Sequence, residues 1–211
     1  LASFKVDAAL RDSKRIAPPP AEWVEWKDPK EGAFTMKVPK GWVAEGGVFR
    51  PYIDAWGMVT CKKGGKNSTA LNFLSPAPPL FTEPNQTLAM AGFQEGSRYN
   101  PSGAGMDCIV MRYLGAAGYI EKCLVPEIAK TYPDARLVST RPRPEFVKAS
   151  PHSDYIQTTG DGADCEVDLT VDGVKVRGYA YVVTTRVSVP GAISLWTATV
   201  GSFCAPPEEL D

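Results

Sequence analysis

Residues 34–47 constrain the fold of this chain more than any other stretch. Phe34, Met36 and Val38 alternate with polar residues, which is the pattern of a strand with one buried face. Pro39, Lys40 and Gly41 interrupt the alternation, and a second apolar run begins at Trp42. This spacing predicts two short strands joined by a tight turn, with an aromatic anchor after the turn. The stretch holds no nucleophile, metal-ligand pair or phosphate-binding loop, so it indicates a fold and no chemistry.

Turn-forming residues recur along the rest of the chain. Among 211 residues there are 19 prolines and 19 glycines, which favours many short elements over long helices. In the last third, residues 153–159, 164–171, 174–187 and 193–203 have the composition of strands. The Asp172-Gly173 pair suits a type I′ hairpin turn. We therefore expect an antiparallel sheet across this region.

Helical periodicity is clearest in residues 117–130. Ile120, Leu124 and Ile128 recur every four positions, and Pro126 should kink or shorten the helix. A shorter helix is expected at 86–93, after a proline-rich stretch at 75–84 that we interpret as a surface loop. Helices beside an antiparallel sheet predict an α+β fold, in which the sheet is flanked by helices.

The domain organisation follows from shifts in composition. Residues 1–20 are interpreted as a leader with a proline-rich linker, and residues 21–205 as a single α+β domain. Residues 206–211 place prolines and acids where a helix would begin, and we interpret them as the start of a truncated C-terminal segment.

Charge and hydropathy exclude several classes of partner. The 23 basic and 24 acidic residues leave a formal charge of −1 with no basic stripe, so a nucleic-acid partner is not expected. No apolar run is long enough to span a membrane. The glycine-rich pieces lack the Lys-Ser/Thr of a phosphate-binding loop, and no cofactor motif is present.

Five cysteines occur without a Cys-x-x-Cys pair, so a zinc knuckle or a thioredoxin-like site is not supported. Spacing leaves two alternatives open. Two disulfides and one free thiol would form in an oxidising compartment, whereas five buried free thiols would suit any compartment. The cysteines are Cys61, Cys108, Cys123, Cys165 and Cys204.

His152 is the only histidine, which excludes multi-histidine metal sites. A hydrolase-like enzyme with Cys165 as nucleophile, His152 as base and Asp154 as its partner is the alternative to a binding function. Cys165 lies in a strand pattern, however, and not at a helix N-terminus, where thiolates are usually activated. We interpret His152 as a histidine of a surface loop.

An acidic stretch surrounds the predicted Asp-Gly hairpin. Calcium sites gather oxygen ligands within one loop, whereas Asp164, Glu166 and Asp168 alternate along a strand. We therefore expect these carboxylates to line the solvent face of the sheet, and no metal site is predicted.

Aromatic and arginine residues are the better indication of binding. Such mixtures are enriched in recognition surfaces. The alternative is that Trp56 and the nearby Tyr113 belong to the core. A third hypothesis is a carbohydrate-attachment domain that uses exposed tryptophan. The candidate binding residues are Arg50, Trp56, Arg98, Tyr99 and Arg112.

Two motifs resemble those of a group of uncharacterised prokaryotic exported proteins. The first is Phe34-x-x-x-Val-Pro-x-Gly-Trp42 with Gly46-Gly47 and Arg50; the second is Leu88-Ala-Met-Ala-Gly-Phe-x-Glu-Gly-x-x-Tyr99. The first motif also looks like the opening hairpin of PsbP-type extrinsic photosystem subunits, which form an antiparallel sheet sandwiched by helices.

The resemblance implies a non-catalytic, extracytoplasmic module that is secreted, periplasmic or surface-anchored. Such a module would bind or scaffold an unknown protein or surface ligand. The resemblance gives no residue a functional role, and the proline-rich stretch at 75–84 departs from a compact PsbP domain.

Overall fold

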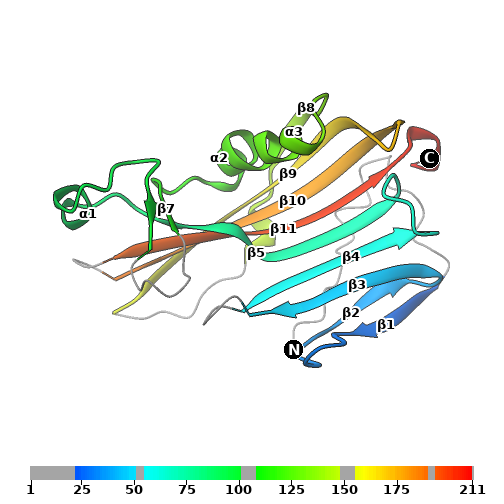
Figure 1. Cartoon of the computed structure of the whole chain (residues 1–211), viewed down its shortest axis with the longest axis horizontal. Helices are drawn as coiled ribbons and strands as arrows, with labels where there is room; N and C mark the ends of the chain where they lie inside the picture. The colour runs from blue at the N-terminus through cyan, green and yellow to red at the C-terminus, as the bar shows by residue number, and fades with distance from the viewer. Residues whose placement is uncertain (1–21, 51–54, 101–107, 148–154, 190–192, 211) are drawn as a thin grey trace.

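One large, mostly antiparallel sheet dominates the molecule (Figure 1). The computed structural model describes residues 22–50, 55–100, 108–147, 155–189 and 193–210. The main strands lie in the order β3 (Trp42–Phe49), β4 (Trp56–Lys63), β5 (Ala70–Thr82), β11 (Ser194–Ala205), β10 (Val174–Ser188), β9 (Gln157–Val171) and β8 (Arg136–Pro142). Neighbours along this path are antiparallel, as expected for the last third of the chain.

Two smaller pieces of sheet extend this body. Strand β7 (Cys108–Val110) runs parallel to the end of β5 and pairs with β6 (Arg98–Tyr99). Strands β1 (Trp23–Lys27) and β2 (Thr35–Pro39) form a separate two-stranded sheet. The two strands and the turn predicted from residues 34–47 are confirmed as β2 and β3, but β2 pairs with β1 and β3 with β4, so the two strands do not form a hairpin with each other.

The register of the large sheet defines two faces, because paired residues on neighbouring strands point to the same side. One row contains Ala163, Val182, Val200, Leu74 and Met58 across β9, β10, β11, β5 and β4. The adjacent row contains Asp164, Tyr181, Gly201, Phe73 and Val59 and points to the opposite face.

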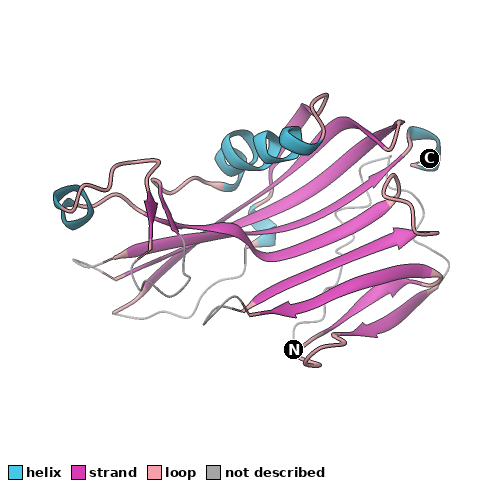
Figure 2. Cartoon of the chain, in the orientation of Figure 1, coloured by secondary structure: helices cyan, strands magenta, loops and turns pink. Residues whose placement is uncertain are grey.

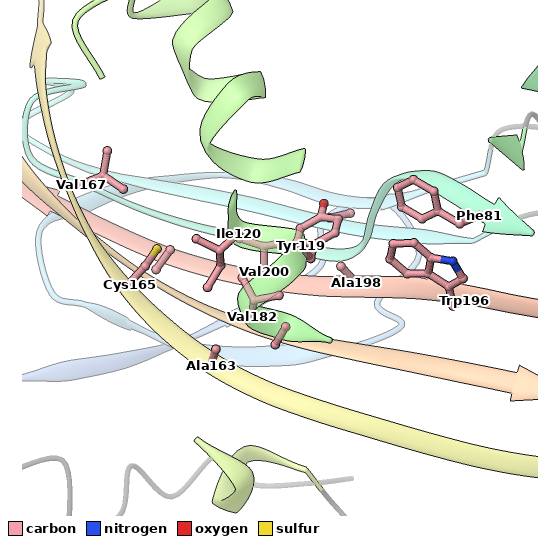
Figure 3. Packing of buried hydrophobic residues seen from close by; sticks show 13 residues of the cluster. Phe81, Tyr119, Ile120, Ala163, Cys165, Val167, Val182, Trp196, Ala198 and Val200 are labelled. Carbon is pink, nitrogen blue, oxygen red and sulfur yellow. The ribbon is translucent and has the colours of Figure 1, made fainter. Parts of the chain in front are cut away.

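A helical segment covers the first of these faces. It consists of α2 (Ala116–Tyr119), η2 (Ile120–Leu124) and α3 (Val125–Thr131). Tyr119 and Ile120 pack onto a core in which the indole of Trp196 stacks on Phe81, with ring centroids 3.9 Å apart (Figure 3). The Trp196 indole N–H donates to the carbonyl of Met111 at 2.9 Å, so the polar group of this buried ring is satisfied.

Pro126 changes the helix without ending it. Residues Ile120–Leu124 form a π-helix, and the N–H of Val125 donates to the carbonyl of Ile120, five residues earlier. The wider turn accommodates a proline that has no N–H and would clash with the preceding turn of an α-helix. The predicted helix at 117–130 is therefore confirmed, with a π-helical distortion just before Pro126.

The β1–β2 hairpin packs on the opposite face, over β4. Val38 of β2 contacts Val59 and Cys61, and Trp26 and Phe34 surround this second core. A short η3 helix (Pro144–Phe146) lies on the same face, where Phe146 packs edge-on against Tyr181.

The expected α+β sandwich flanked by helices is wrong. The fold is β-rich, as Figure 2 shows. Of the residues that the structure describes, 55% are in strands and 16% are helical. The expected helix at 86–93 contracts to α1 (Gln86–Met90), and the 75–84 stretch is mainly strand, since β5 continues to Thr82. The β5–β11 pairing shifts register near Ala77, where prolines can be accommodated without ladder hydrogen bonds.

The described chain ends in η4 (Pro207–Glu209) rather than an α-helix, with Leu210 buried against the body. The predicted leader at 1–20 lies outside the described residues, and the division into one domain at 21–205 stays a prediction. In the part of the chain that the structure describes, no helix has the length and apolar character needed to cross a membrane.

Edge strand β8 is irregular. Its pairing with β9 shifts between Leu137 and Ser139, which leaves Val138 exposed in a bulge. Arg136 begins this strand and Pro142 ends it.

Candidate functional site

The five candidate binding residues do not form one surface. Arg50 and Trp56 belong to the β3–β4 hairpin, whereas Arg98 and Tyr99 form β6 and Arg112 follows β7. Tyr99 packs edge-on against Phe93, with ring centroids 5.0 Å apart, so its ring supports the loop after α1. Arg98 and Arg112 are both exposed, and the Arg112 side chain is 79% exposed.

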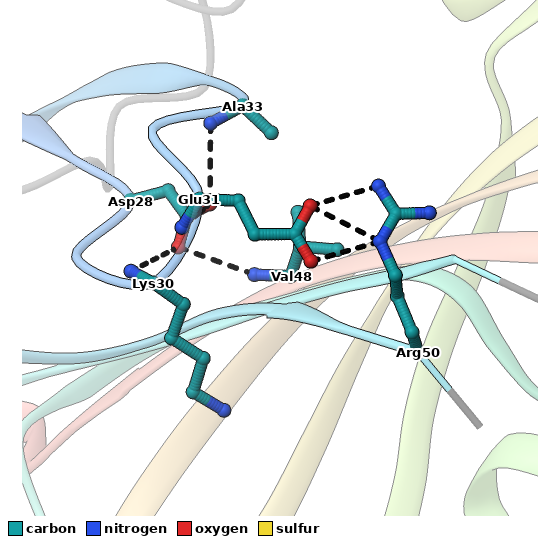
Figure 4. A network of polar contacts seen from close by, with 6 residues as sticks. All are labelled: Asp28, Lys30, Glu31, Ala33, Val48 and Arg50. Carbon is teal, nitrogen blue, oxygen red and sulfur yellow. Dashed lines mark hydrogen bonds and ion pairs between the residues drawn. The ribbon is translucent and has the colours of Figure 1, made fainter. Parts of the chain in front are cut away.

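Arg50 has a structural partner. Its Nε and Nη2 atoms each donate to the Glu31 carboxylate at 2.8 Å (Figure 4). This pair connects the turn of the β1–β2 hairpin to the end of β3. Trp56 is half-buried opposite Phe49, and its buried indole N–H has no hydrogen-bond partner among the residues that the structure describes. The core interpretation of Trp56 is therefore closer to the structure.

Asp28 connects the same two segments, the β1–β2 turn and β3, through its buried carboxylate (Figure 4). Its carboxylate accepts hydrogen bonds from the backbone N–H groups of Lys30, Glu31, Ala33 and Val48. Burial raises the pKa of Asp28, but these four donors outweigh it, and the pKa lies below the ordinary value of 3.8. Sequence reasoning missed this residue, although an Asp before Pro-Lys-Glu-Gly is a recognisable turn signal.

A pocket opens beside Arg112. It has a volume of about 440 Å³ and is lined by Glu83, Pro84, Asn85, Arg112 and Ser194. We call it the Glu83 pocket. The backbone N–H of Glu83 donates to the carbonyl of Ser194 at 2.9 Å, which fixes the end of β5 against β11. Asn85 caps α1 through Oδ1, which accepts from the N–H of Leu88 at 2.9 Å.

A network of polar side chains supports the floor of this pocket. The Glu83 carboxylate accepts from the N–H of Tyr113 and faces Arg186 at 3.5 Å, while the Arg186 guanidinium lies over the Tyr113 ring. The Tyr113 hydroxyl shares a 3.0 Å hydrogen bond with Thr184, which is fully buried. Burial raises the pKa of Tyr113.

Asp161, the strand partner of Thr184, accepts from the N–H of Ala116 at the start of α2 at 2.8 Å. Sequence reasoning gave no role to Glu83, Thr184 or Arg186, because neither their types nor their spacing indicate that they meet. The Pro-Asn pair after Glu83 was the available signal, since Asn85 before a helical pattern predicts an N-cap.

Apolar side chains gather at the end of the sheet where β10 ends and β11 begins. Ile156, Val189 and Ile193 lie one step past the last paired residues of β9, β10 and β11, and Val187 precedes them on β10. We call these four residues the tip row. Their exposure is between 38% and 47%, and Tyr155 beside them is 82% exposed.

The tip row and the Glu83 pocket lie on opposite faces of the sheet. Ser194 has the same alternation as Trp196, which faces the helical segment, whereas Ile193 has the opposite alternation. The two sites therefore lie at the same end of the sheet but on different faces of it. The sequence did not reveal the tip row, because alternating apolar residues in a strand normally indicate burial.

Cys165 is not placed as an activated nucleophile. Its side chain is fully buried in the core, and burial raises the pKa of the thiol to about 11. His152 and Asp154, its predicted partners, lie outside the described residues. All five cysteines are free thiols, so the two-disulfide alternative is not formed.

The acidic stretch on β9 is paired with arginines. Asp164, Glu166 and Asp168 share the face opposite the helical segment, where they contact Arg141 and Arg177. The alternation was predicted, but the expected solvent exposure is wrong for Asp164 and Glu166, whose side chains are 13% exposed among the arginines. A hydrogen bond from Arg177 lowers the pKa of Asp168. Within the described ranges, no three His, Cys, Asp or Glu side chains are placed to hold a metal ion.

Comparison with protein-family models, with curated proteins and with solved structures finds no match to this chain.

Proposed function

We propose that this protein is a non-catalytic binding module that recognises a protein partner through the tip row. The exposure of the four aliphatic side chains of the tip row carries the proposal. Ile156, Val189 and Ile193 continue the register of three adjacent strands, so they form one contiguous apolar strip. Tyr155 adds an aromatic ring at its margin.

Exposing a contiguous apolar strip to water is unfavourable in free energy. A single exposed aliphatic residue is ordinary, but a contiguous apolar patch with a polar rim is typical of an interaction surface. On the same face, Thr158 pairs with Val187 across β9 and β10 and provides a polar side chain at the margin of the strip. Covering the strip with a partner would remove its side chains from water.

A protein partner suits the charges at this end better than a membrane. Binding to an anionic membrane surface typically uses a cluster of four to eight basic residues. Here Arg112 and Arg186 are matched by Glu95 and Glu83 at 3.4 and 3.5 Å. Local neutrality of this kind favours a surface of mixed polarity over an anionic bilayer.

The other hypotheses have less support. The enzyme alternative needs Cys165 as a thiolate, which its burial opposes. The carbohydrate hypothesis needs exposed tryptophan, and Trp23 on β1 is the tryptophan among the exposed large apolar residues. The extracytoplasmic location stays a prediction that depends on the resemblance alone.

Photocrosslinking at the tip row tests the proposal. A photoreactive benzoylphenylalanine replaces Val189 in the full chain, and a control protein carries it at Val43 on β3, whose exposure is 48%. Irradiation of both proteins in their source cells, followed by mass spectrometry, should give a defined protein adduct at position 189 and not at position 43. The substitution Ile193→Asp should lower the adduct yield about tenfold or more, because central apolar contacts dominate interface energy.

Equal adducts from both positions would contradict the proposal, as would adducts with lipid alone. An adduct with a second copy of the chain would identify the partner as the protein itself. A yield that Ile193→Asp leaves unchanged, in a variant with wild-type circular dichroism, would also overturn the role of the tip row.

A further inference from the structure

The free polar groups that line the Glu83 pocket are mainly hydrogen-bond donors. Asn85 uses Oδ1 to cap α1, which leaves its amide nitrogen for other partners. The carbonyl of Ser194 already accepts from the N–H of Glu83 and from the Thr82 hydroxyl. The Ser194 hydroxyl and the Arg112 guanidinium are the other donor groups of the lining.

The negative charge of the pocket is largely compensated. The Glu83 side chain is 23% exposed, and its two oxygens face different partners, the N–H of Tyr113 at 3.2 Å and the Arg186 guanidinium at 3.5 Å. The backbone bond to Ser194 holds it in place. Glu83 therefore forms part of the floor of the pocket. Because both of its oxygens already have donors, a cationic ligand is not needed to balance its charge.

The positive charge of the pocket is more available. The Arg112 side chain is 79% exposed, and in the described part of the chain its partner is Glu95, which contacts Nε at 3.4 Å. Glu95 also accepts from the backbone N–H of Arg112, so the start of the side chain is fixed. The two terminal nitrogens of the guanidinium can present a planar pair of donors to a ligand.

From these groups we infer that the Glu83 pocket binds a carboxylate group. A carboxylate matches the planar donor pair of Arg112 and can accept further hydrogen bonds from Asn85 and Ser194. A phosphate dianion fits less well, since a single exposed arginine lines the pocket and Glu83 and Glu95 lie close by. The ligand is therefore a monoanionic carboxylate, either a free small acid or the carboxylate of a peptide.

This site is separate from the partner surface proposed above. The pocket lies on the face of the helical segment, and the tip row lies on the other face. Failure of one proposal therefore leaves the other intact.

An NMR titration tests the inference. Amide spectra of the 15N-labelled full chain are recorded with N-acetylglycine, with its neutral amide and with sodium phosphate. N-Acetylglycine should shift the amides of Asn85, Arg112 and Ser194 saturably, with a dissociation constant on the order of millimolar. The substitution Arg112→Gln should weaken binding about five- to tenfold. Arg136→Gln is the matched control, because Arg136 is 77% exposed and pairs with Asp168 at 3.5 Å on β8.

Equal shifts with the neutral amide, tighter binding of phosphate, or an unchanged affinity in Arg112→Gln would each overturn the inference. A peptide, acetyl-Ala-Ala-Gly, distinguishes the two sources. If it binds more tightly with a free C-terminus than as its amide, and more tightly than N-acetylglycine, the site recognises a peptide carboxylate. If it binds no better than N-acetylglycine, the site recognises a small acid. Wild-type amide dispersion in both variants excludes unfolding as the cause.

Discussion

The two faces of the large sheet are covered in different ways. Under the helical segment, 13 buried apolar residues of the described part of the chain form a core that includes the stacked pair of Trp196 and Phe81. Under the β1–β2 hairpin, three buried residues of the described ranges form the core, and polar contacts of Asp28 and Glu31 hold its margin. The large core is held mainly by apolar packing, whereas the small core depends also on charge. The two regions should therefore respond to different perturbations.

The largest effect is expected from Trp196→Ala. The substitution removes a fully buried ring and its hydrogen bond to Met111, which should lower the free energy of unfolding by about 3–5 kcal/mol. Urea unfolding followed by circular dichroism measures the change. The control Trp23→Ala, at an exposed position on β1, should change it by less than about 0.5 kcal/mol. Similar values for the two variants would show that the large core does not dominate stability.

A smaller and local effect is expected from Gly47→Ala. Gly47 has φ +129°, and an added Cβ would lie 2.3 Å from Oδ1 of Asp28. The substitution should destabilise docking of the β1–β2 hairpin by about 1–3 kcal/mol. Amide hydrogen exchange should show this loss in β1 and β2, with β9–β11 unchanged.

Gly57→Ala on β4 is its matched control, since the nearest atom to an added Cβ there is 3.6 Å away. Uniform loss of protection across both sheets in Gly47→Ala would mean that the two regions unfold as one unit.

Acid should loosen the hairpin region through two carboxylates. A hydrogen bond from Arg50 lowers the pKa of Glu31, and backbone donors keep the pKa of Asp28 below 3.8 despite its burial. A carboxyl with a lowered pKa in the folded state stabilises the fold above its ordinary pKa. That contribution is lost as the pH falls through the pKa that the carboxyl has in the folded state. The protection of the β1 and β2 amides against hydrogen exchange should therefore decrease below about pH 4.5.

The variant Asp28→Asn separates this effect from acid effects elsewhere, such as those at Asp168. It should weaken hairpin protection at neutral pH and flatten its dependence on acid, as measured by amide exchange between pH 7 and 3. An unchanged pH profile in the variant would exclude Asp28 as the source.

The smallest expected effect is kinetic and needs no substitution. Cys61 is buried in the small core and Cys165 in the large core, and burial raises the pKa of both thiols. Alkylation therefore requires local opening. If the small core opens more readily, iodoacetamide should label Cys61 about tenfold faster than Cys165 under native conditions. Peptide mass spectrometry follows both sites, and equal rates would contradict two separately opening regions.

Local sequence patterns predicted local structure well. The alternation in residues 34–47 gave β2 and the start of β3, and Asp172-Gly173 forms the expected turn, with φ of 51° and 79°. The helical repeat identified the segment over the large core. The fold class was wrong because strand content depends on pairing between distant segments, which brings even the prolines of β5 into a sheet.

The candidate site was less accessible to sequence analysis. The binding role expected of Arg112 stays a prediction: its side chain is exposed and lines the Glu83 pocket, whereas Arg50 forms an ion pair with Glu31. Glu83 and Arg186 are about a hundred positions apart in the chain, and they meet only because β5, β11 and β10 are neighbours. The order of the strands in the sheet decides this contact, and that order cannot be deduced from the local patterns of a single sequence.

The bulge at Val138 in β8 has a consequence for assembly. A regular edge strand presents a continuous ladder of N–H and C=O groups to which another chain can add a strand. In β8 the bulge interrupts that ladder, Pro142 lacks an N–H, and Arg136 places a charge at its start. The β8 edge of the sheet is thus protected against the addition of strands from other copies of the chain, which would build a filament. A partner that binds at the tip row would leave this protection in place.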